Sequence, residues 1–321
     1  MRVAIDELNM AHTRVQQTQD GIPVFGGEAI IHPGATGNLR SISERFVRSI
    51  SADSTPELSD LQAIDLALAS SRGWDALSRT PTAELFMLRH QDRDYLSYKV
   101  DLFYLESPED PTMPVIFINA KTGAEIMRYD NLQTARDRRI YDANNRMFMP
   151  GQLRISEGQG EIYQGESGAL NEATSDILTA AIEAWARGNV DQDVWHIGED
   201  CWLSDDALRF MDNPSADDNS RDHYQDRYIG REDNGGVHYN SGIGNLFFYL
   251  LSQGGDHPNP NRRVATVTGI GIEQAAAIWY RALTIYMTSS TDFAGARTAT
   301  ENACADLYSA GSMECKSVGA A

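Results

Sequence analysis

The sequence is short of cysteine and of long apolar runs, and each shortage argues against a class of protein. Its three cysteines form no Cys-x-x-Cys pair, which argues against a zinc site made of thiolates. No stretch of about 18 consecutive apolar residues occurs, so we expect no membrane-spanning helix. The patterns GxxxxGK(S/T) and GxSxG are also missing, which argues against a P-loop and a nucleophile elbow.

Basic residues are scarce relative to acidic ones. There are 27 of the former and 46 of the latter, giving a net charge of -19. Such a field repels phosphate, so we expect no binding to nucleic acid or to an anionic membrane. The acidity favours solubility, and carboxylate clusters that hold calcium are the alternative. Residues 1–17 have no apolar core of a signal peptide, so we expect a protein that stays inside the cell or a chain that begins after its targeting segment.

Two of the cysteines, Cys304 and Cys315, bracket ten residues typical of a helix end and a turn. A disulfide closing this loop would place the protein outside the cytoplasm. Two unpaired buried thiols are the alternative.

Residues 1–130 are predicted to be an α+β region, a small sheet packed on a helix. The Gly-Gly of "IPVFGGEAIIH" predicts a hairpin turn at residues 26–27. "DLQAIDLALASSRG" has helical periodicity and is predicted to end on Gly73. Alternating segments predict strands in 83–90, 95–106 and 114–131, the last of them a hairpin through "NAKTG".

Residues 131–148 are charged and short of apolar periodicity, and they are interpreted as a linker. Arg136, Arg138 and Arg139 make it a candidate for proteolytic processing, and an ordinary solvated connection is an equally good interpretation. From residue 166 the chain is predicted to be an all-α domain. Its first helix is predicted to bury one apolar stripe. The stripe comprises Leu170, Ala173, Ile177, Ala181 and Trp185.

That first helix also carries Glu172 and Asp176 on one face, at i, i+4 spacing. Like charges there lower helix stability unless something offsets them. A metal would do so, and so would simple exposure to water. The pair suits one corner of a zinc site, but a catalytic zinc needs three protein ligands.

Three further side chains are candidates for chemistry. His238 follows a Gly-Gly pair and has Asp233 nearby, which suits a general acid or an oxyanion partner. The alternative is a histidine that makes local hydrogen bonds at the start of a helix. Arg209 could form a surface ion pair or point its planar fork at a carbonyl in a cleft. Tyr163 could donate to an oxyanion or be a packed aromatic.

An acidic set between residues 183 and 200 could hold calcium, because calcium prefers several carboxylate oxygens. The set does not match an EF-hand loop, and a solvated surface loop is the alternative. Its members are Glu183, Asp191, Asp193, Glu199 and Asp200.

The order of the segments is more specific than any one of them. "ESGALNEATSD", "LRFMDNP", "DNGGVHYNSGIGN" and "GIGIEQAAAIWYRAL" follow one another as in the C-terminal domain of thermolysin-like zinc metalloendopeptidases, which residues 163–321 resemble. Upstream, "HTRVQQTQDGIPVFGGEAIIH" resembles the fungalysin/thermolysin propeptide, and "LSYKVDLFYLES" onward resembles its PepSY part. The resemblance implies an α+β chain: a propeptide region over 1–130, a linker with a remnant of the catalytic domain over 131–165, and an α-helical domain over 166–321.

The resemblance also implies roles. Glu172 matches a zinc ligand, and Asp176 matches the acid that orients a ligand histidine. His238 matches the residue that stabilises the transition state, with Asp233 as its partner. Arg209 matches the arginine that binds the substrate backbone, and Tyr163 matches the tyrosine that assists His238.

For calcium, the resemblance implies binding positions at Glu183 and Glu199, with Asp193 as a third candidate. His196 stands where relatives with two calcium ions have an acid. The family's setting implies secretion and a protein or peptide as substrate.

The family's HExxH motif is absent. None of the seven histidines is followed by Glu, and none has a histidine four residues on. One carboxylate cannot hold a catalytic zinc, and no water would then be activated. We therefore expect no peptide cleavage, and we expect apolar helix faces to be left uncovered. Two hypotheses follow: an internal deletion from a secreted precursor, or a pseudoenzyme whose pro-region binds, inhibits or helps fold an intact peptidase.

Overall fold

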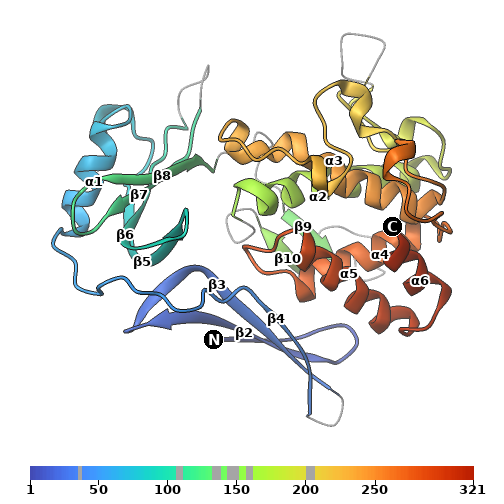
Figure 1. Cartoon of the computed structure of the whole chain (residues 1–321), viewed down its shortest axis with the longest axis horizontal. Coiled ribbons are helices and arrows are strands. Elements are labelled where there is room, and N and C mark those ends of the chain that lie inside the picture. Colours follow the sequence, from blue (N-terminus) through green and yellow to red (C-terminus); the bar gives the residue numbers. More distant parts are fainter. Residues whose placement is uncertain (35–37, 106–110, 132–138, 143–151, 157–161, 200–206) are drawn as a thin grey trace. The chain divides into compact units, whose positions relative to one another are not determined.

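The computed structural model describes residues 1–34, 38–105, 111–131, 139–142, 152–156, 162–199 and 207–321. The chain divides into two compact units, which we describe separately. The first comprises Met1–Tyr163 with Thr288–Ser290, and the second comprises Gln164–Met287 with Thr291–Ala321. The predicted α+β class is confirmed, because a β-sheet region precedes a mainly helical one (Figure 1).

The first unit is built on a sheet in the order β1-β2-β3-β5-β6-β7-β8, with β4 beside β3. Neighbouring strands are antiparallel except β3 and β5, which pair in parallel at Val24 and Met87. A separate hairpin pairs β9 with β10. The strands are β1 (Arg2–Ile5), β2 (Ala11–Gln19), β3 (Ile22–Pro33), β4 (Leu39–Glu44), β5 (Thr82–His90), β6 (Arg93–Asp101), β7 (Pro114–Asn119), β8 (Glu125–Asp130), β9 (Arg139–Asp142) and β10 (Gln152–Ser156).

The helix of this unit, α1 (Asp60–Ala69), lies against the sheet (Figure 1). Ser59 begins it with a capping box, in which the side chains of Ser59 and Gln62 each accept from the other's backbone. The predicted end at Gly73 is wrong, because the helix stops at Ala69 and Gly73 instead precedes a short 3-10 turn, Trp74–Ala76.

The predicted turn at residues 26–27 is also wrong. Strand β3 runs through both glycines, and the chain reverses earlier, at Asp20 and Gly21, which both have positive φ. The glycines instead form an irregularity in the β2–β3 ladder, where the Gln16 amide donates to the Val24 carbonyl at 2.7 Å and the Gly27 carbonyl at 2.9 Å. A Gly-Gly pair suits a bulge as well as a turn, since both need unusual φ.

The other predicted strands are present, although the one predicted over residues 95–106 ends at Asp101. The hairpin through "NAKTG" joins β7 to β8, and the Asn119 side chain accepts the Lys121 backbone N–H at 2.9 Å in its turn. In the predicted linker, Arg139 begins a strand instead, because it pairs with Ser156. Arg136 and Arg138 lie outside the described residues.

The second unit is mainly helical, as predicted. Helices α2 and α3 lie side by side (Figure 1), and a short ladder pairs β11 with β12. The elements are α2 (Gly165–Arg187), β11 (His196–Ile197), β12 (Arg209–Phe210), α3 (Asp233–Gln253), α4 (Ile272–Arg281), a π turn (Ala282–Tyr286), α5 (Phe293–Tyr308) and α6 (Met313–Ala320).

The buried stripe of α2 differs from the prediction at its C-terminal end. After Ile177 it continues through Ala180 and Ala184, whereas Ala181 is only half-buried and Trp185 is 83% exposed. Successive steps of four residues rotate by roughly 40° around an α-helix, so two such steps leave the buried face. The structure therefore alternates steps of three and four.

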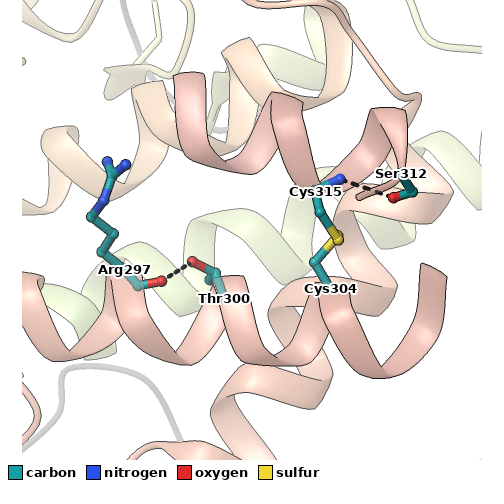
Figure 2. Close-up of a disulfide and its surroundings, with 5 residues drawn as sticks. All are labelled: Arg297, Thr300, Cys304, Ser312 and Cys315. Atoms are coloured by element: carbon teal, nitrogen blue, oxygen red, sulfur yellow. Dashed lines mark hydrogen bonds between the residues drawn. A yellow bond between two sulfur atoms is a disulfide. The ribbon is translucent and has the colours of Figure 1, made fainter. Parts of the chain in front are cut away.

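Two cross-links hold the last helices of this unit. Cys304 on α5 and Cys315 on α6 form a disulfide (Figure 2). Inside the core, Arg281 Nε donates to Asp306 Oδ2 at 2.7 Å, and the Tyr286 hydroxyl donates to the same oxygen at 2.6 Å. The remaining cysteine, Cys201, lies outside the described residues.

Candidate active-site remnant

Helix α2 presents two buried carboxylates one turn apart. Glu172 is 6% exposed and Asp176 is 2% exposed, so exposure to water does not relieve their repulsion. Burial of an ionised carboxylate requires hydrogen bonds or a nearby cation. The structure supplies both for Asp176, and it places His238 beside Glu172.

Asp176 is held by Arg209 and Asn245. Arg209 Nε donates to Oδ2 at 2.7 Å and Nη2 donates to Oδ1 at 2.8 Å, while Asn245 Nδ2 on α3 donates to Oδ2 at 2.8 Å. Desolvation alone would lower the pKa of Arg209, but the hydrogen bond and charge of Asp176 raise it above its usual value. The alternative of a surface ion pair for Arg209 is therefore wrong, since the pair is largely buried.

A left-handed turn begins α3 and sets the place of His238. Four consecutive residues have positive φ: Asp233 at 52°, Asn234 at 50°, Gly235 at 88° and Gly236 at 83°. Side chains would not fit at the two glycines, because a Cβ at 235 would lie 3.2 Å from the Gly165 backbone and one at 236 would lie 2.6 Å from the Tyr228 ring.

His238 lies between two acids. Its Nδ1 is 2.6 Å from Asp233 Oδ1, its backbone N–H donates to Asp233 Oδ2 at 2.7 Å, and its Nε2 is 3.5 Å from Glu172 Oε2. The hydrogen bond to Asp233 raises the pKa of His238. Burial opposes this effect, the charges of Glu172 and Asp233 add to it, and Arg209 opposes it, so the pKa stands above its usual value.

Arg209 and the ring of His238 thus face the buried acids. The structure brings five of the predicted residues into this one site, which we call the acid–base cluster. Its members are Glu172, Asp176, Arg209, Asp233 and His238. Tyr163 is buried and belongs to the first unit.

Sequence reasoning missed two supporting asparagines of α3. Asn245 binds Asp176 directly. Asn240 accepts the Tyr228 backbone N–H at 2.7 Å and donates to the Tyr228 carbonyl at 3.0 Å, which fixes the segment that packs on Gly236. Two amides next to the apolar residues of α3 were the available signal, because a buried amide needs partners.

A catalytic zinc ion does not fit this cluster. Among the residues that the structure describes, no group of three His, Cys, Asp or Glu side chains could hold a metal. Both oxygens of Asp176 accept from Arg209, and Nδ1 of His238 faces Asp233. Glu172 alone cannot replace three ligands.

The predicted calcium residues lie elsewhere in the same unit. Glu183, Asp193 and Glu199 surround the guanidinium of Arg187, and Asp191 joins them. His196 makes its own contacts, with Gln192 at 3.1 Å and Asp212 at 3.8 Å. Asp200 lies outside the described residues.

Comparisons with known proteins match both parts of the chain. The family model described as "Thermolysin metallopeptidase, alpha-helical domain" matches residues 160–321, and the "Fungalysin/Thermolysin Propeptide Motif" matches residues 1–46. A precursor of protealysin, a metalloproteinase from Serratia proteamaculans, is a similar solved structure, with a TM-score of 0.41, 28% identity, and coverage of 50% of this chain and 49% of that one.

Two relatives align with different shares of this chain. Bacillolysin of Brevibacillus brevis is 28% identical over 447 residues, which cover 98% of this chain and 82% of the relative. Thermolysin of Alicyclobacillus acidocaldarius is 48% identical over 162 residues, which are 50% of this chain and 28% of that protein. In the part of the chain that the structure describes, no helix is long and apolar enough to cross a membrane.

Proposed function

Since this chain belongs to the thermolysin metallopeptidase family and carries that family's propeptide motif, we propose that it is a member without peptidase activity of its own. One observation carries the proposal: the buried carboxylates of Asp176 and Glu172 face Arg209 and His238 and not a set of metal ligands. A bound zinc would supply a nucleophilic hydroxide from water at neutral pH. The residues present do not hold it, so no hydrolytic step follows.

The missing ligands support the same proposal. No HExxH occurs anywhere in the sequence. The alignment with the Brevibacillus bacillolysin extends over 447 residues, which is longer than this whole chain of 321, so part of that relative has no counterpart here. We place the loss between Gly158 and Gly165, where the two resembling stretches meet.

The remaining residues can still bind without reacting. His238 has one nitrogen, Nε2, directed toward Glu172, and Asp233 holds the other. A protonated ring in this position could donate to a peptide carbonyl. Arg209 is committed to Asp176 through two of its nitrogens, so substrate would compete with that pair.

Activity is tested on the purified whole chain, incubated with zinc and calcium chloride and then assayed on casein. We expect hydrolysis no faster than in the buffer control, and no zinc retained after gel filtration, measured by mass spectrometry. Casein hydrolysis that phenanthroline abolishes would refute the proposal. Replacement of His238 by Gln is the matched control, since it separates activity of this site from a contaminating peptidase.

The propeptide motif gives a second candidate function. Residues 1–46 match it, and the unit that contains them has its own buried core of α1 and the sheet. We propose that this unit binds an intact relative and inhibits it or assists its folding. Titration of an active thermolysin-like peptidase with the whole chain tests this: a fall in initial rate or a higher refolding yield supports it, and neither effect contradicts it.

We also propose that the protein is secreted, on the strength of the disulfide and of the family. Cytosolic proteins rarely keep such bonds. Sequencing the gene and its transcript across the codons for residues 158–165 separates the two origins. An intervening segment that encodes HExxH would mean an intact secreted parent, and contiguous codons would mean that the zinc site is lost.

A further inference from the structure

The guanidinium of Arg187 lies among four carboxylates. Its Nη2 is 2.5 Å from Glu183 and 3.3 Å from Glu199, and its Nη1 is 3.2 Å from Asp193 and 3.5 Å from Asp191. Each terminal nitrogen thus contacts two carboxylates. We call these five residues the Arg187 cluster.

The local fold explains why a cation lies here. Arg187 is the last residue of α2, where the helix dipole favours positive charge. Glu183 precedes it by one helical turn, and Gly188 in a left-handed conformation then turns the chain. That turn brings the aspartates of the next segment back to the guanidinium, and Glu199 follows β11.

Two of these four acids, Glu183 and Glu199, stand at positions that the family resemblance assigns to calcium, and Asp193 and Asp191 belong to the acidic set that was a candidate for calcium. Calcium requires about six to eight oxygen ligands at roughly 2.3–2.6 Å. In this chain the carboxylates converge on nitrogen donors that already carry a positive charge. A calcium ion could reach the same oxygens only by displacing the guanidinium, so the described residues do not fit the ion.

We propose that Arg187 takes the place of a bound calcium ion and acts as a permanent cation for these acids. Its ion pairs hold the end of α2, the following segment and the residues after β11 together. Because this cation is part of the chain, it cannot dissociate as a bound ion can. An arginine stays protonated at every physiological pH, and a planar guanidinium can donate to several carboxylates at once.

The proposal changes what calcium should do to stability. An ion that binds only the folded state stabilises it by an amount that grows with the logarithm of the ion concentration. A side chain gives a contribution that is independent of the calcium concentration. This inference does not depend on whether the chain cleaves peptides.

Thermal unfolding of the whole chain tests it, with Arg187→Gln beside the unaltered protein, each in EDTA and in millimolar calcium chloride. For the unaltered protein we expect the same Tm in both buffers. For Arg187→Gln we expect a Tm lower by about 2–4 °C in EDTA, largely recovered in calcium because four carboxylates are then free to bind the ion.

Arg297→Gln is the matched control. Arg297 lies in the same unit and pairs with one carboxylate, that of Glu301, so its loss should create no response to calcium. Arg187→Lys provides a second variant: it keeps the charge but places it on one atom, so we expect a Tm between those of the other two in EDTA. Isothermal titration of each protein with calcium measures binding directly.

Three results would overturn the proposal. A Tm of the unaltered protein that rises by several degrees in calcium would mean that the ion binds despite Arg187. If the Tm of Arg187→Gln is lower and calcium does not restore it, the cluster is a set of ordinary ion pairs. If Arg187→Gln and Arg297→Gln have the same Tm in EDTA, the Arg187 cluster has no special structural role.

Discussion

Arg209 binds both oxygens of Asp176, with Nε 2.7 Å from Oδ2 and Nη2 2.8 Å from Oδ1. The two residues are 33 positions apart in the sequence, and their pair connects β12 to the buried face of α2. In a peptidase with zinc, the resemblance would place a ligand histidine beside this aspartate. Here the arginine and Asn245 satisfy it.

Replacing Arg209 by Gln should destabilise the helical unit severely, because it leaves a charged carboxylate buried without its cation. Breaking a buried pair from one side lowers the free energy of unfolding by about 3–5 kcal/mol. Urea unfolding followed by circular dichroism measures the loss. Adding Asp176→Asn to the same protein should recover part of it, since the uncharged amide costs less to bury. A loss below about 1 kcal/mol, as for an exposed pair, would contradict the burial.

The pH dependence of His238 follows from its raised pKa. Asp233 and Glu172 favour the protonated ring in the folded state. The stabilisation from this ring is therefore complete below its usual pKa near 6.5 and is lost as the pH rises through the higher folded value. NMR titration of the His238 ring in EDTA measures that pKa. Asp233→Asn should lower it toward the usual value, and an unchanged titration would show that Asp233 does not control the ring.

The buried pair Arg281–Asp306 offers an internal comparison with a surface pair. Both side chains are almost fully buried, with exposed fractions of 1% and 0%. Arg281→Met should lower the free energy of unfolding by about 3–5 kcal/mol, because the buried carboxyl group of Asp306 loses its partner. Arg297→Gln removes the exposed pair with Glu301 and should cost no more than about 1 kcal/mol. Equal losses in the two variants would argue against burial as the cause.

The disulfide should contribute a measurable part of the stability of the helical unit. Cys304 and Cys315 close a loop with a sequence separation of 11. Its loss should lower the free energy of unfolding by about 2–4 kcal/mol. Unfolding with and without a reductant measures this in the unaltered protein, and the double variant Cys304→Ala, Cys315→Ala should not respond to the reductant. Identical curves for the unaltered protein in both conditions would mean that the bond does not form.

The sequence predicted the elements better than their ends. Alternating apolar residues and turn residues identified the strands from Thr82 to Asp130, because the two-residue period of the sequence follows the burial of these strands. The pattern could not distinguish a bulge from a turn at Gly26, because both tolerate the same backbone conformation. It also placed Trp185 on the buried face of α2, where a small error in helical phase accumulates over two turns.

For the site, the resemblance named the residues of the acid–base cluster, and their assigned roles stay predictions. The sequence could not show which side chain pairs with each charged residue. Arg209 pairs with Asp176 only through tertiary structure. Arg187 escaped notice although it stands four residues after Glu183, because an acidic set predicts a bound ion without indicating that a side chain supplies the charge.

The left-handed turn before His238 has a consequence for how such a site can be inherited. The turn depends on Asn234, Gly235 and Gly236, on a hydrogen bond to Glu232, and on close packing with Tyr228 and Gly165. None of these contacts involves a metal ion. The position of the imidazole is thus set by a few neighbouring residues of the same chain, so it does not require the HExxH motif that the sequence lacks. A histidine held in this way can mark descent from an enzyme without being evidence of activity.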